Sequence, residues 1–285
     1  MKSFKIKSFC KINLYLKVVK KLNNGYHEIV SLVTFSNPYD VISISKNNNL
    51  RDQISFKGNF KKGINNKSNT ITKVLGLLRK KKLLKNQTFK INITKNIPHG
   101  SGLGGGSSNA ANLLNYLNIS MGLNLKSIKM ERLAKQIGSD VPIFLKKKNA
   151  FISGKKGKIL RLNQKFKLNL LIIYPNIISS TKKIYRKNKI MSLPQNIFQI
   201  KKKDKLIKFL KKENNDLEKT AIKLYPKIQQ VIKYIKSQKG CYFSRITGSG
   251  SACIGIFSNM KNALYAKKLI KIRYPKYWCV VSKTM

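Results

Sequence analysis

A glycine-rich segment at residues 100–106, Gly-Ser-Gly-Leu-Gly-Gly-Gly, has the residue types in this sequence that most directly suggest chemistry. It lies between a predicted strand that runs to Pro98 and a predicted helix that carries Ala110. Glycine lets backbone N–H groups approach an anion without a Cβ atom in the way. The N-terminus of the following helix adds unpaired N–H donors and a positive dipole end. The segment therefore predicts a phosphate-binding loop. A flexible linker is disfavoured, because linkers seldom join a strand end to a helix start.

Three well-known phosphate-binding patterns can be compared with this segment. A Walker A loop is excluded, because no Gly-Lys pair in the sequence is followed by Ser or Thr. The dinucleotide pattern G-x-G-x-x-G does occur, but residues 120–126 contain no acid to bind the ribose, which that fold places about 20 positions on. The protein-kinase motifs His-Arg-Asp and Asp-Phe-Gly are missing as well.

Carboxylates are scarce, so few residues are candidates for a catalytic base or a metal ligand. The chain of 285 residues has 60 Lys and Arg against 9 Asp and Glu, and no acid lies between Asp52 and Glu131. Asp140 is the best candidate base, because it follows a helix-ending Gly138 and precedes the apolar run 141–144. A carboxylate in that position either caps a helix or serves a dry functional site, and the residues alone leave both readings open.

The strongly basic composition has two explanations. Clustered cations would indicate a nucleic-acid binder, whereas a genome rich in A and T would enrich Lys, Asn and Ile together. The Lys residues are spread from end to end, so we favour compositional drift, and a basic surface would still favour anionic small substrates. No apolar run reaches the roughly 18 residues that a membrane span needs.

The four cysteines contain no CxxC pair, which argues against a zinc site. Scattered cysteines in a chain of this length suit a reducing compartment. The basic N-terminus lacks a continuous apolar segment and a small-residue cleavage site, and its residues 10–13 belong to a motif described below, so we expect no removable leader. These observations predict a cytoplasmic protein. The cysteines are Cys10, Cys241, Cys253 and Cys279.

Periodicity predicts the elements that would position the loop and Asp140. We expect strands at 4–19, 29–35, 40–45, 89–98, 168–174, 243–246, 252–257 and 277–281, with a short strand between the polar segments 146–149 and 155–157. We expect helices that begin near Ser68-Asn69-Thr70 and Ala110, and others over 130–137, 217–235 and 263–270. Asp216 and Glu218 would start the long helix over 217–235. The polar stretch 179–213 gives no clear assignment, and the pattern as a whole is α+β in two parts.

The segment from Pro98 to Ala110 resembles the second conserved motif of the GHMP kinases, a superfamily of small-molecule kinases. The resemblance covers nearly the whole chain in order, through segments 9–14, 24–27, 138–144, 215–218 and 245–253. The triple glycine followed by Ser-Ser-Asn is most similar to the branch whose substrate is a methylerythritol that carries cytidine diphosphate. This sequence departs from the pattern by Phe9-Cys10 in place of Pro-Ala, by Asn24 in place of an acid, and by an extra Ser in the last segment.

The resemblance implies catalytic roles for two residues. Asp140 matches the catalytic base, and Lys11 matches the catalytic lysine, which would orient Asp140 and stabilise developing negative charge. ATP would bind to the loop, and we expect it to contact Pro98, His99, Gly100, Ser101, Gly102, Leu103, Gly104, Gly105, Gly106, Ser107 and Ser108. Magnesium should accompany ATP. With no carboxylate in or near the loop, Ser107 or Ser108 and water are the candidates to hold Mg²⁺, and its ligands stay open.

The resemblance also implies a binding site for the cytidyl substrate. Tyr26 and His27 match a pair that contacts the cytosine ring, where an aromatic face stacks on the base and His reads its edge. Alignment of the stretch 174–185 adds Thr181 and puts Tyr185 at a second aromatic position. We expect Asn13 to hold the substrate, and Lys95 to reach a phosphate.

The sequence therefore predicts an α+β protein with the two-domain GHMP kinase fold. Residues 1–155 would form an ATP-binding domain like ribosomal protein S5 domain 2, and residues 156–285 a ferredoxin-like domain. The predicted activity is ATP-dependent phosphorylation of the 2-hydroxyl of the cytidyl-linked methylerythritol, without a specific nucleic acid or membrane partner. One alternative is another GHMP kinase, which would act on homoserine, mevalonate or a sugar. A second is an RNA-binding protein on a decayed kinase fold, against which the intact Lys11, Asp140 and glycine loops argue.

Overall fold

The computed structural model describes residues 3–23, 25–154, 157–193 and 202–285. The chain forms two compact units, and both are discontinuous in sequence. Unit 1 comprises Met1–Cys10, Pro38–His99 and Gly104–Lys147, and unit 2 comprises Lys11–Asn37, Gly100–Leu103 and Lys148–Met285. The domain boundary that the sequence places between residues 155 and 156 is a single cut, and it stays a prediction.

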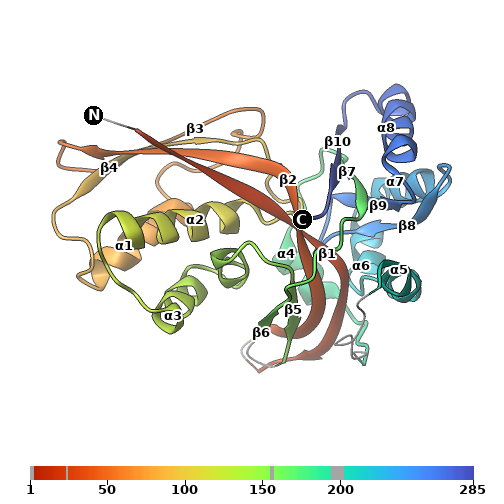
Figure 1. Ribbon diagram of the computed structural model, residues 1–285, viewed down its shortest axis with the longest axis horizontal. Coiled ribbons are helices and arrows are strands. Elements are labelled where there is room, and N and C mark those ends of the chain that lie inside the picture. The colour runs from red at the N-terminus through yellow and green to blue at the C-terminus, as the bar shows by residue number, and fades with distance from the viewer. Residues whose placement is uncertain (1–2, 24, 155–156, 194–201) are drawn as a thin grey trace. The chain divides into compact units, whose positions relative to one another are not determined.

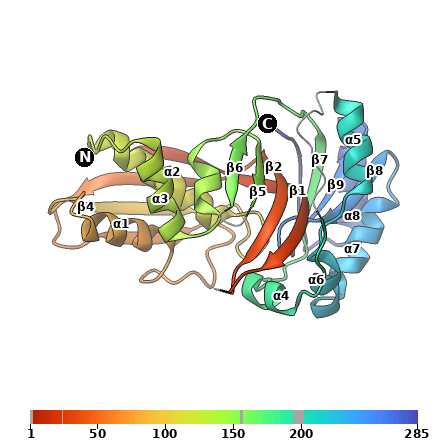
Figure 2. The same cartoon turned by 90° about the horizontal axis from the view of Figure 1, so that it is seen from below.

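Unit 1 is a small sheet with helices on one face (Figures 1 and 2). Its strands are β3 (Gln53–Lys57), β4 (Thr88–Thr94) and the second half of β2 (His27–Asn47). β3 runs parallel to β4, and β4 pairs antiparallel with β2 so that Thr94 lies opposite Val41. The helices are α1 (Thr70–Lys80), α2 (Gly105–Ser120), α3 (Ser127–Ile137) and the short 3-10 helix η1 (Val141–Leu145).

Local sequence explains the elements of unit 1. Asn69 caps α1, since its side chain accepts hydrogen bonds from the N–H groups of Ile71 and Thr72. Along β4, the buried Phe89, Ile91 and Ile93 alternate with more exposed residues, as expected for a strand with one face on the core. β3 was not predicted. The two strands expected at 29–35 and 40–45 form the single strand β2.

Unit 2 contains a four-stranded antiparallel sheet in the order β10-β7-β9-β8. Its strands are β7 (Asn169–Tyr174), β8 (Cys241–Ile246), β9 (Cys253–Phe257) and β10 (Trp278–Lys283), and α7 (Lys227–Lys236) and α8 (Met260–Arg273) pack on it. This succession of strand, helix, two strands, helix and strand is the ferredoxin-like arrangement. The prediction of a ferredoxin-like C-terminal domain is confirmed.

Unit 2 also contains the first half of β2 and the part of β1 from Lys11 onward. β1 (Phe4–Lys21) pairs with β2, which also pairs with β5 (Ala150–Ser153), and β5 pairs with the unpredicted β6 (Lys158–Arg161). The polar stretch 179–213 contains α4 (Thr181–Lys187) and α5 (Lys203–Lys212), while 194–201 lies outside the described residues.

The single helix predicted over 217–235 is wrong. α6 (Glu218–Leu224) ends before Pro226, and α7 begins after it. Proline has no N–H for the helical ladder, and its ring clashes with the preceding turn, so a new helix starts there. The apolar repeat nevertheless continues through the break, because Leu217, Ala221, Ile228, Val231 and Ile235 all join the buried core of unit 2.

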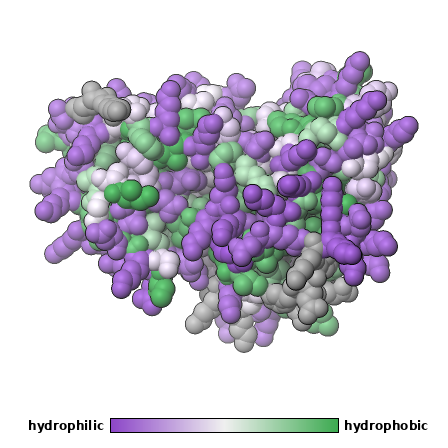
Figure 3. Space-filling model, in the orientation of Figure 1, coloured by the Kyte–Doolittle hydropathy of each residue, from purple (hydrophilic) through white to green (hydrophobic). Residues whose placement is uncertain are grey.

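The surface carries many hydrophilic side chains (Figure 3). Hydrophilic side chains, purple in Figure 3, are distributed across the face shown. Among the helices that the structure describes, none has the length and apolar character that a bilayer crossing requires.

Candidate active site

The glycine loop leads directly into α2. Gly104 precedes the helix with φ 72°, a left-handed conformation that glycine adopts without steric cost. No side chain at this position caps α2, so the N–H groups of the first turn remain available to an anion. The predicted strand, loop and helix are confirmed by β4, the loop and α2.

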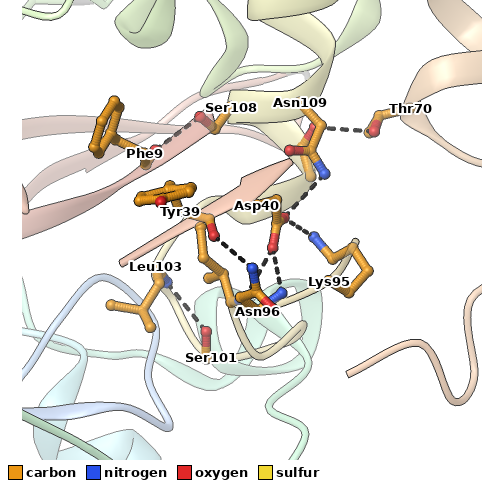
Figure 4. A network of polar contacts seen from close by, with 12 residues as sticks. Phe9, Tyr39, Asp40, Thr70, Lys95, Asn96, Ser101, Leu103, Ser108 and Asn109 are labelled. Carbon is orange, nitrogen blue, oxygen red and sulfur yellow. Dashed lines mark hydrogen bonds and ion pairs between the residues drawn. The ribbon is translucent and has the colours of Figure 1, made fainter. Parts of the chain in front are cut away.

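Hydroxyl groups fix the first turn of α2 (Figure 4). Ser108 is buried, and its Oγ donates to the backbone oxygen of Phe9 at 2.7 Å. Thr70 donates from its Oγ1 to the backbone oxygen of Gly106 at 2.9 Å, which ties the start of α1 to the loop. Ser107 is only partly buried. Ser107 and Ser108 were candidates to hold magnesium, and of the two Ser108 already has a structural partner.

A buried carboxylate that sequence reasoning missed lies at the base of the loop. Asp40 is fully buried on β2 and accepts hydrogen bonds from the backbone N–H groups of Asn96 at 2.8 Å and Ile97 at 2.9 Å. It also accepts from the side-chain nitrogens of Lys95 and Asn109 (Figure 4). The expectation that no carboxylate lies in or near the loop is wrong, because the pairing of β2 with β4 brings Asp40 to it.

Lys95 was expected to reach a phosphate, but in the structure its ammonium group pairs with Asp40. Both side chains are almost completely buried. One sequence signal pointed to Asp40: an acid at the start of an apolar, β-branched strand must be paired if the strand is buried.

Asp140 belongs to unit 1 and directly precedes η1. Its side chain makes no capping hydrogen bond to that helix. The side chain of Asp140 therefore does not cap η1. The carboxylate is partly buried, and the next four residues, 141–144, are buried.

Lys11 and Asn13 lie together on β1 in unit 2. The ammonium group of Lys11 donates to Oδ1 of Asn13, and Nδ2 of Asn13 donates to Oγ of Ser31 at 2.7 Å. The backbone N–H of Asn13 donates to Oγ1 of Thr247 at 2.8 Å. Lys11 is 4% exposed, so this lysine is not an ordinary surface cation. Asn13 was predicted to hold the substrate, but both polar atoms of its side-chain amide form hydrogen bonds with Lys11 and Ser31.

The segment 245–253, which contains Gly248 and Gly250, packs against Lys11. A Cβ atom added to Gly248 would lie 3.0 Å from Nζ of Lys11 and 3.3 Å from Oδ1 of Asn13, so only glycine allows this approach. The backbone N–H of Lys11 donates to the oxygen of Leu103 at 3.0 Å. The N–H of Ala252 donates to the oxygen of Ser101 at 3.0 Å. Segments 11–14, 100–103 and 245–253, far apart in sequence, are therefore brought together within unit 2.

Two of the residues predicted to bind cytosine, His27 and Tyr185, meet in unit 2. The rings of His27 and Tyr185 lie 5.1 Å apart between centroids, at an interplanar angle of 38°. Tyr26 is 64% exposed and so offers its ring to a ligand. Burial and the positive charge of Lys21 lower the pKa of His27 below its ordinary value, which favours the neutral ring. Asn24 lies outside the described residues.

Other predicted residues have structural partners. Oγ1 of Thr181, the first residue of α4, lies 2.8 Å from Oγ of Ser249. The oxygen of Gly100 accepts from the N–H of Ser179 at 2.8 Å. Nε2 of His99 lies 2.7 Å from the backbone oxygen of Lys62. Pro98 is buried. Gly102 lies in the loop, and Gly105 is the first residue of α2.

The acids near α6 hold the fold rather than a ligand. Asp216 was expected to start a helix, but its Oδ2 accepts from the N–H of Val18 on β1 at 2.8 Å. Glu218 is the first residue of α6, and its Oε2 accepts from the N–H of Ile246 at 2.8 Å. Burial raises the pKa of Glu218. Within the described ranges, no three His, Cys, Asp or Glu side chains gather as a metal site.

Comparison with known families places two segments of the chain. The pattern of the GHMP kinases N terminal domain matches residues 69–148, and that of the GHMP kinases C terminal domain matches residues 202–272. The chain is 39% identical to the 4-diphosphocytidyl-2-C-methyl-D-erythritol kinase of Pelagibacter ubique, with all of both chains covered. It is 32% identical to the Anaplasma phagocytophilum protein of the same name, with 98% of this chain and 93% of that protein covered.

Solved structures show the same fold. A crystal structure of 4-(cytidine 5'-diphospho)-2C-methyl-D-erythritol kinase matches with a TM-score of 0.79 and 23% identity, covering 98% of this chain and 99% of that one. A homoserine kinase from Cytophaga hutchinsonii matches with a TM-score of 0.74 and 16% identity, covering 100% of this chain and 95% of that one. At these identities the likeness establishes the architecture and leaves the substrate to other observations.

Proposed function

Since this chain belongs to the GHMP kinase family, we propose that it transfers the γ-phosphoryl group of ATP to the 2-hydroxyl of 4-diphosphocytidyl-2-C-methyl-D-erythritol. This reaction would be a step in non-mevalonate isoprenoid precursor synthesis. Full-length identity to relatives of that name supports the proposal. The observation that carries the choice of substrate is the ring of Tyr185 beside that of His27, with the exposed ring of Tyr26 next in sequence. A nucleobase is the kind of ligand that aromatic side chains hold by stacking.

The chemistry assigns one task to each of two residues. The oxygen of the 2-hydroxyl attacks the γ-phosphorus, the bond from that phosphorus to the bridging oxygen breaks, and ADP leaves. The hydroxyl proton passes to the carboxylate of Asp140, which directly precedes η1 and does not cap it. Lys11, buried and held by Asn13, stabilises the negative charge that develops. Asn13 acts mainly through Lys11.

The loop from Pro98 to Ser108 binds the phosphates of ATP in this proposal. The uncapped N-terminus of α2 supplies N–H donors and the positive end of the helix dipole. Magnesium would arrive with ATP, because Mg²⁺ keeps several waters and binds through phosphates and few protein groups. Asp40 fits it poorly, since four donors already occupy that carboxylate. Ser107 fits better, because it is partly exposed at the loop. Bound magnesium would neutralise phosphate charge.

A cytoplasmic location is part of the proposal. All four cysteines are free thiols, and three of them are buried, as suits a reducing compartment. The high positive charge then serves no specific nucleic acid, although it favours an anionic substrate.

The test is product analysis with purified protein, ATP and magnesium. Phosphorus NMR should show a new monoester resonance on the cytidyl substrate, formed in equal amount to ADP. Turnover of homoserine, mevalonate or galactose instead would assign the chain to another GHMP branch. Salt-dependent RNA binding without ATP turnover with any alcohol would favour the RNA-binding alternative.

A further inference from the structure

We propose that Asp40 is a positioning residue for nucleotide binding. Its buried carboxylate holds the two ends of the phosphate loop, Asn96–Ile97 before it and Asn109 after it, in the geometry that ATP requires. The inference rests on the proposed function, because it takes this loop as the ATP site.

The entry to the loop is fixed by one oxygen of Asp40. The antiparallel register that pairs Val41 with Thr94 places Asp40 next to Lys95, where β4 ends. From there Oδ1 accepts from the N–H groups of Asn96 at 2.8 Å and Ile97 at 2.9 Å. The side chain of Asn96 also donates to the backbone oxygen of Tyr39 at 3.1 Å. The chain therefore leaves β4 in a conformation that β2 dictates.

The exit from the loop is fixed by the other oxygen of Asp40. Oδ2 accepts from Nδ2 of Asn109, in the second turn of α2, at 3.0 Å (Figure 4). Asn109 is 2% exposed, so water does not compete for this bond. One carboxylate thus joins the strand before the loop to the helix after it. A shift of α2 relative to β4 would break a charge-assisted hydrogen bond at one end or the other.

Lys95 completes the arrangement directly beneath the start of α2. Its ammonium group pairs with Oδ2 of Asp40, and a Cβ atom added to Gly105 would lie 3.3 Å from its Nζ. A buried carboxylate without a cation near a phosphate loop would repel ATP and would be costly to desolvate. We therefore assign to Lys95 the neutralisation of Asp40 beneath the loop, in place of direct contact with a phosphate.

The competing interpretation is an ion pair that only stabilises the fold. Unit 1 contains a pair of that kind for comparison. Asp52 accepts two hydrogen bonds from Arg79, at 2.5 and 2.9 Å, and one from the N–H of Phe89 at 2.9 Å. It clamps α1 to the start of β4, at the end of that strand opposite to the loop. Asp52→Asn is therefore a matched control for Asp40→Asn.

The first experiment measures ATP binding by calorimetry, with Michaelis constants and thermal midpoints beside it. In Asp40→Asn, the amide nitrogen cannot accept hydrogen bonds. The variant must therefore lose the contacts of Asp40 either to the entry of the loop or to its exit. ATP binding should weaken at least about tenfold, while the Michaelis constant of the cytidyl alcohol changes less than about threefold. Asp52→Asn should lower the thermal midpoint about as much as Asp40→Asn does, because each variant weakens a paired carboxylate. It should leave ATP affinity within about twofold of wild type.

A second pair of variants tests the role of Lys95. If Lys95 acts only through Asp40, then Lys95→Met should add less than about twofold to the loss already caused by Asp40→Asn. A further tenfold loss in the double variant would place Lys95 on the phosphates and overturn this account of the pair.

Unchanged ATP affinity in a folded Asp40→Asn protein would overturn the inference, as would an equal loss in Asp52→Asn. If Asp40→Asn does not fold, Asn109→Ala removes only the exit contact, and an ATP affinity equal to wild type would then overturn it. A wild-type protein that binds no ATP would instead count against the proposed function. The two failures are therefore distinguishable.

Discussion

The rings of Tyr185 and His27 lie 5.1 Å apart between centroids, although one residue belongs to α4 and the other begins β2. This contact places an aromatic ring beside the Tyr26–His27 pair, and it joins two residues that are far apart in sequence. It gives the proposed cytosine site two of its three side chains in one place. The third, Tyr26, remains 64% exposed.

Removal of either tyrosine ring should weaken binding of the cytidyl substrate. Base–aromatic stacking contributes about 1–3 kcal/mol per contact, so Tyr26→Ala or Tyr185→Ala should raise the Michaelis constant roughly five- to a hundredfold. The constant for ATP should stay nearly unchanged. Tyr185→Phe keeps the ring and should behave almost like wild type. Tyr265→Ala, at an exposed tyrosine of α8, controls for loss of an aromatic residue elsewhere. Unchanged constants in both alanine variants would remove cytosine from this site.

The left-handed conformation of Gly104 predicts that a branched side chain there abolishes ATP binding. Gly104→Val would strain the backbone at φ 72° and place methyl groups where a phosphate must approach. ATP affinity should collapse while the far-UV circular dichroism spectrum stays folded. Gly122→Val is the matched control, because Gly122 has φ 59°, nothing within 4 Å of an added Cβ, and lies beyond the end of α2. Equal ATP affinity in Gly104→Val and wild type would mean that the phosphates bind elsewhere.

Replacement of Asp140 by its amide should separate catalysis from binding. Asp140→Asn is nearly isosteric but cannot accept the hydroxyl proton, so turnover should fall at least about a hundredfold. ATP affinity measured by calorimetry should persist. Turnover near the wild-type value would exclude Asp140 as the base.

The pKa of His27 predicts a specific dependence of stability on pH. Burial first, and then the charge of Lys21, lower this pKa from 6.5, so between the lowered value and 6.5 the unfolded chain binds more protons than the folded one. The free energy of unfolding should therefore rise as pH increases through that window. The contribution of His27 to it should be fully present above pH 6.5. Thermal midpoints recorded from acid to neutral pH should show this rise, and His27→Gln should reduce it. An identical profile for the two proteins would show that His27 does not titrate differently on folding.

Much of this arrangement follows from local sequence. The helix cap at Asn69, the alternation of Phe89, Ile91 and Ile93, and the glycine loop before α2 are each specified by residues within a few positions of one another. The long amphipathic repeat of 217–235 correctly indicates a buried helical face. It does not indicate the break, since one proline outweighs the apolar period that surrounds it.

Long-range pairing accounts for what local sequence did not reveal. Asp40 and Lys95 meet only because the antiparallel register of β2 and β4 brings them together, and no local pattern encodes that register. The same holds for β3, which packs as a parallel neighbour of β4. Residues matched to motifs could be named in advance, whereas those that act through tertiary contacts needed the structure.

The most direct test of the central claim compares two alcohols with the wild-type enzyme at fixed ATP and magnesium. One is 4-diphosphocytidyl-2-C-methyl-D-erythritol, and the other is 2-C-methyl-D-erythritol 4-phosphate, which lacks the cytidylate but keeps the 2-hydroxyl. Two stacking contacts at about 1–3 kcal/mol each predict that kcat/KM for the cytidyl substrate exceeds that for the truncated one by at least about thirtyfold. Equal or higher kcat/KM for the truncated alcohol would contradict the account.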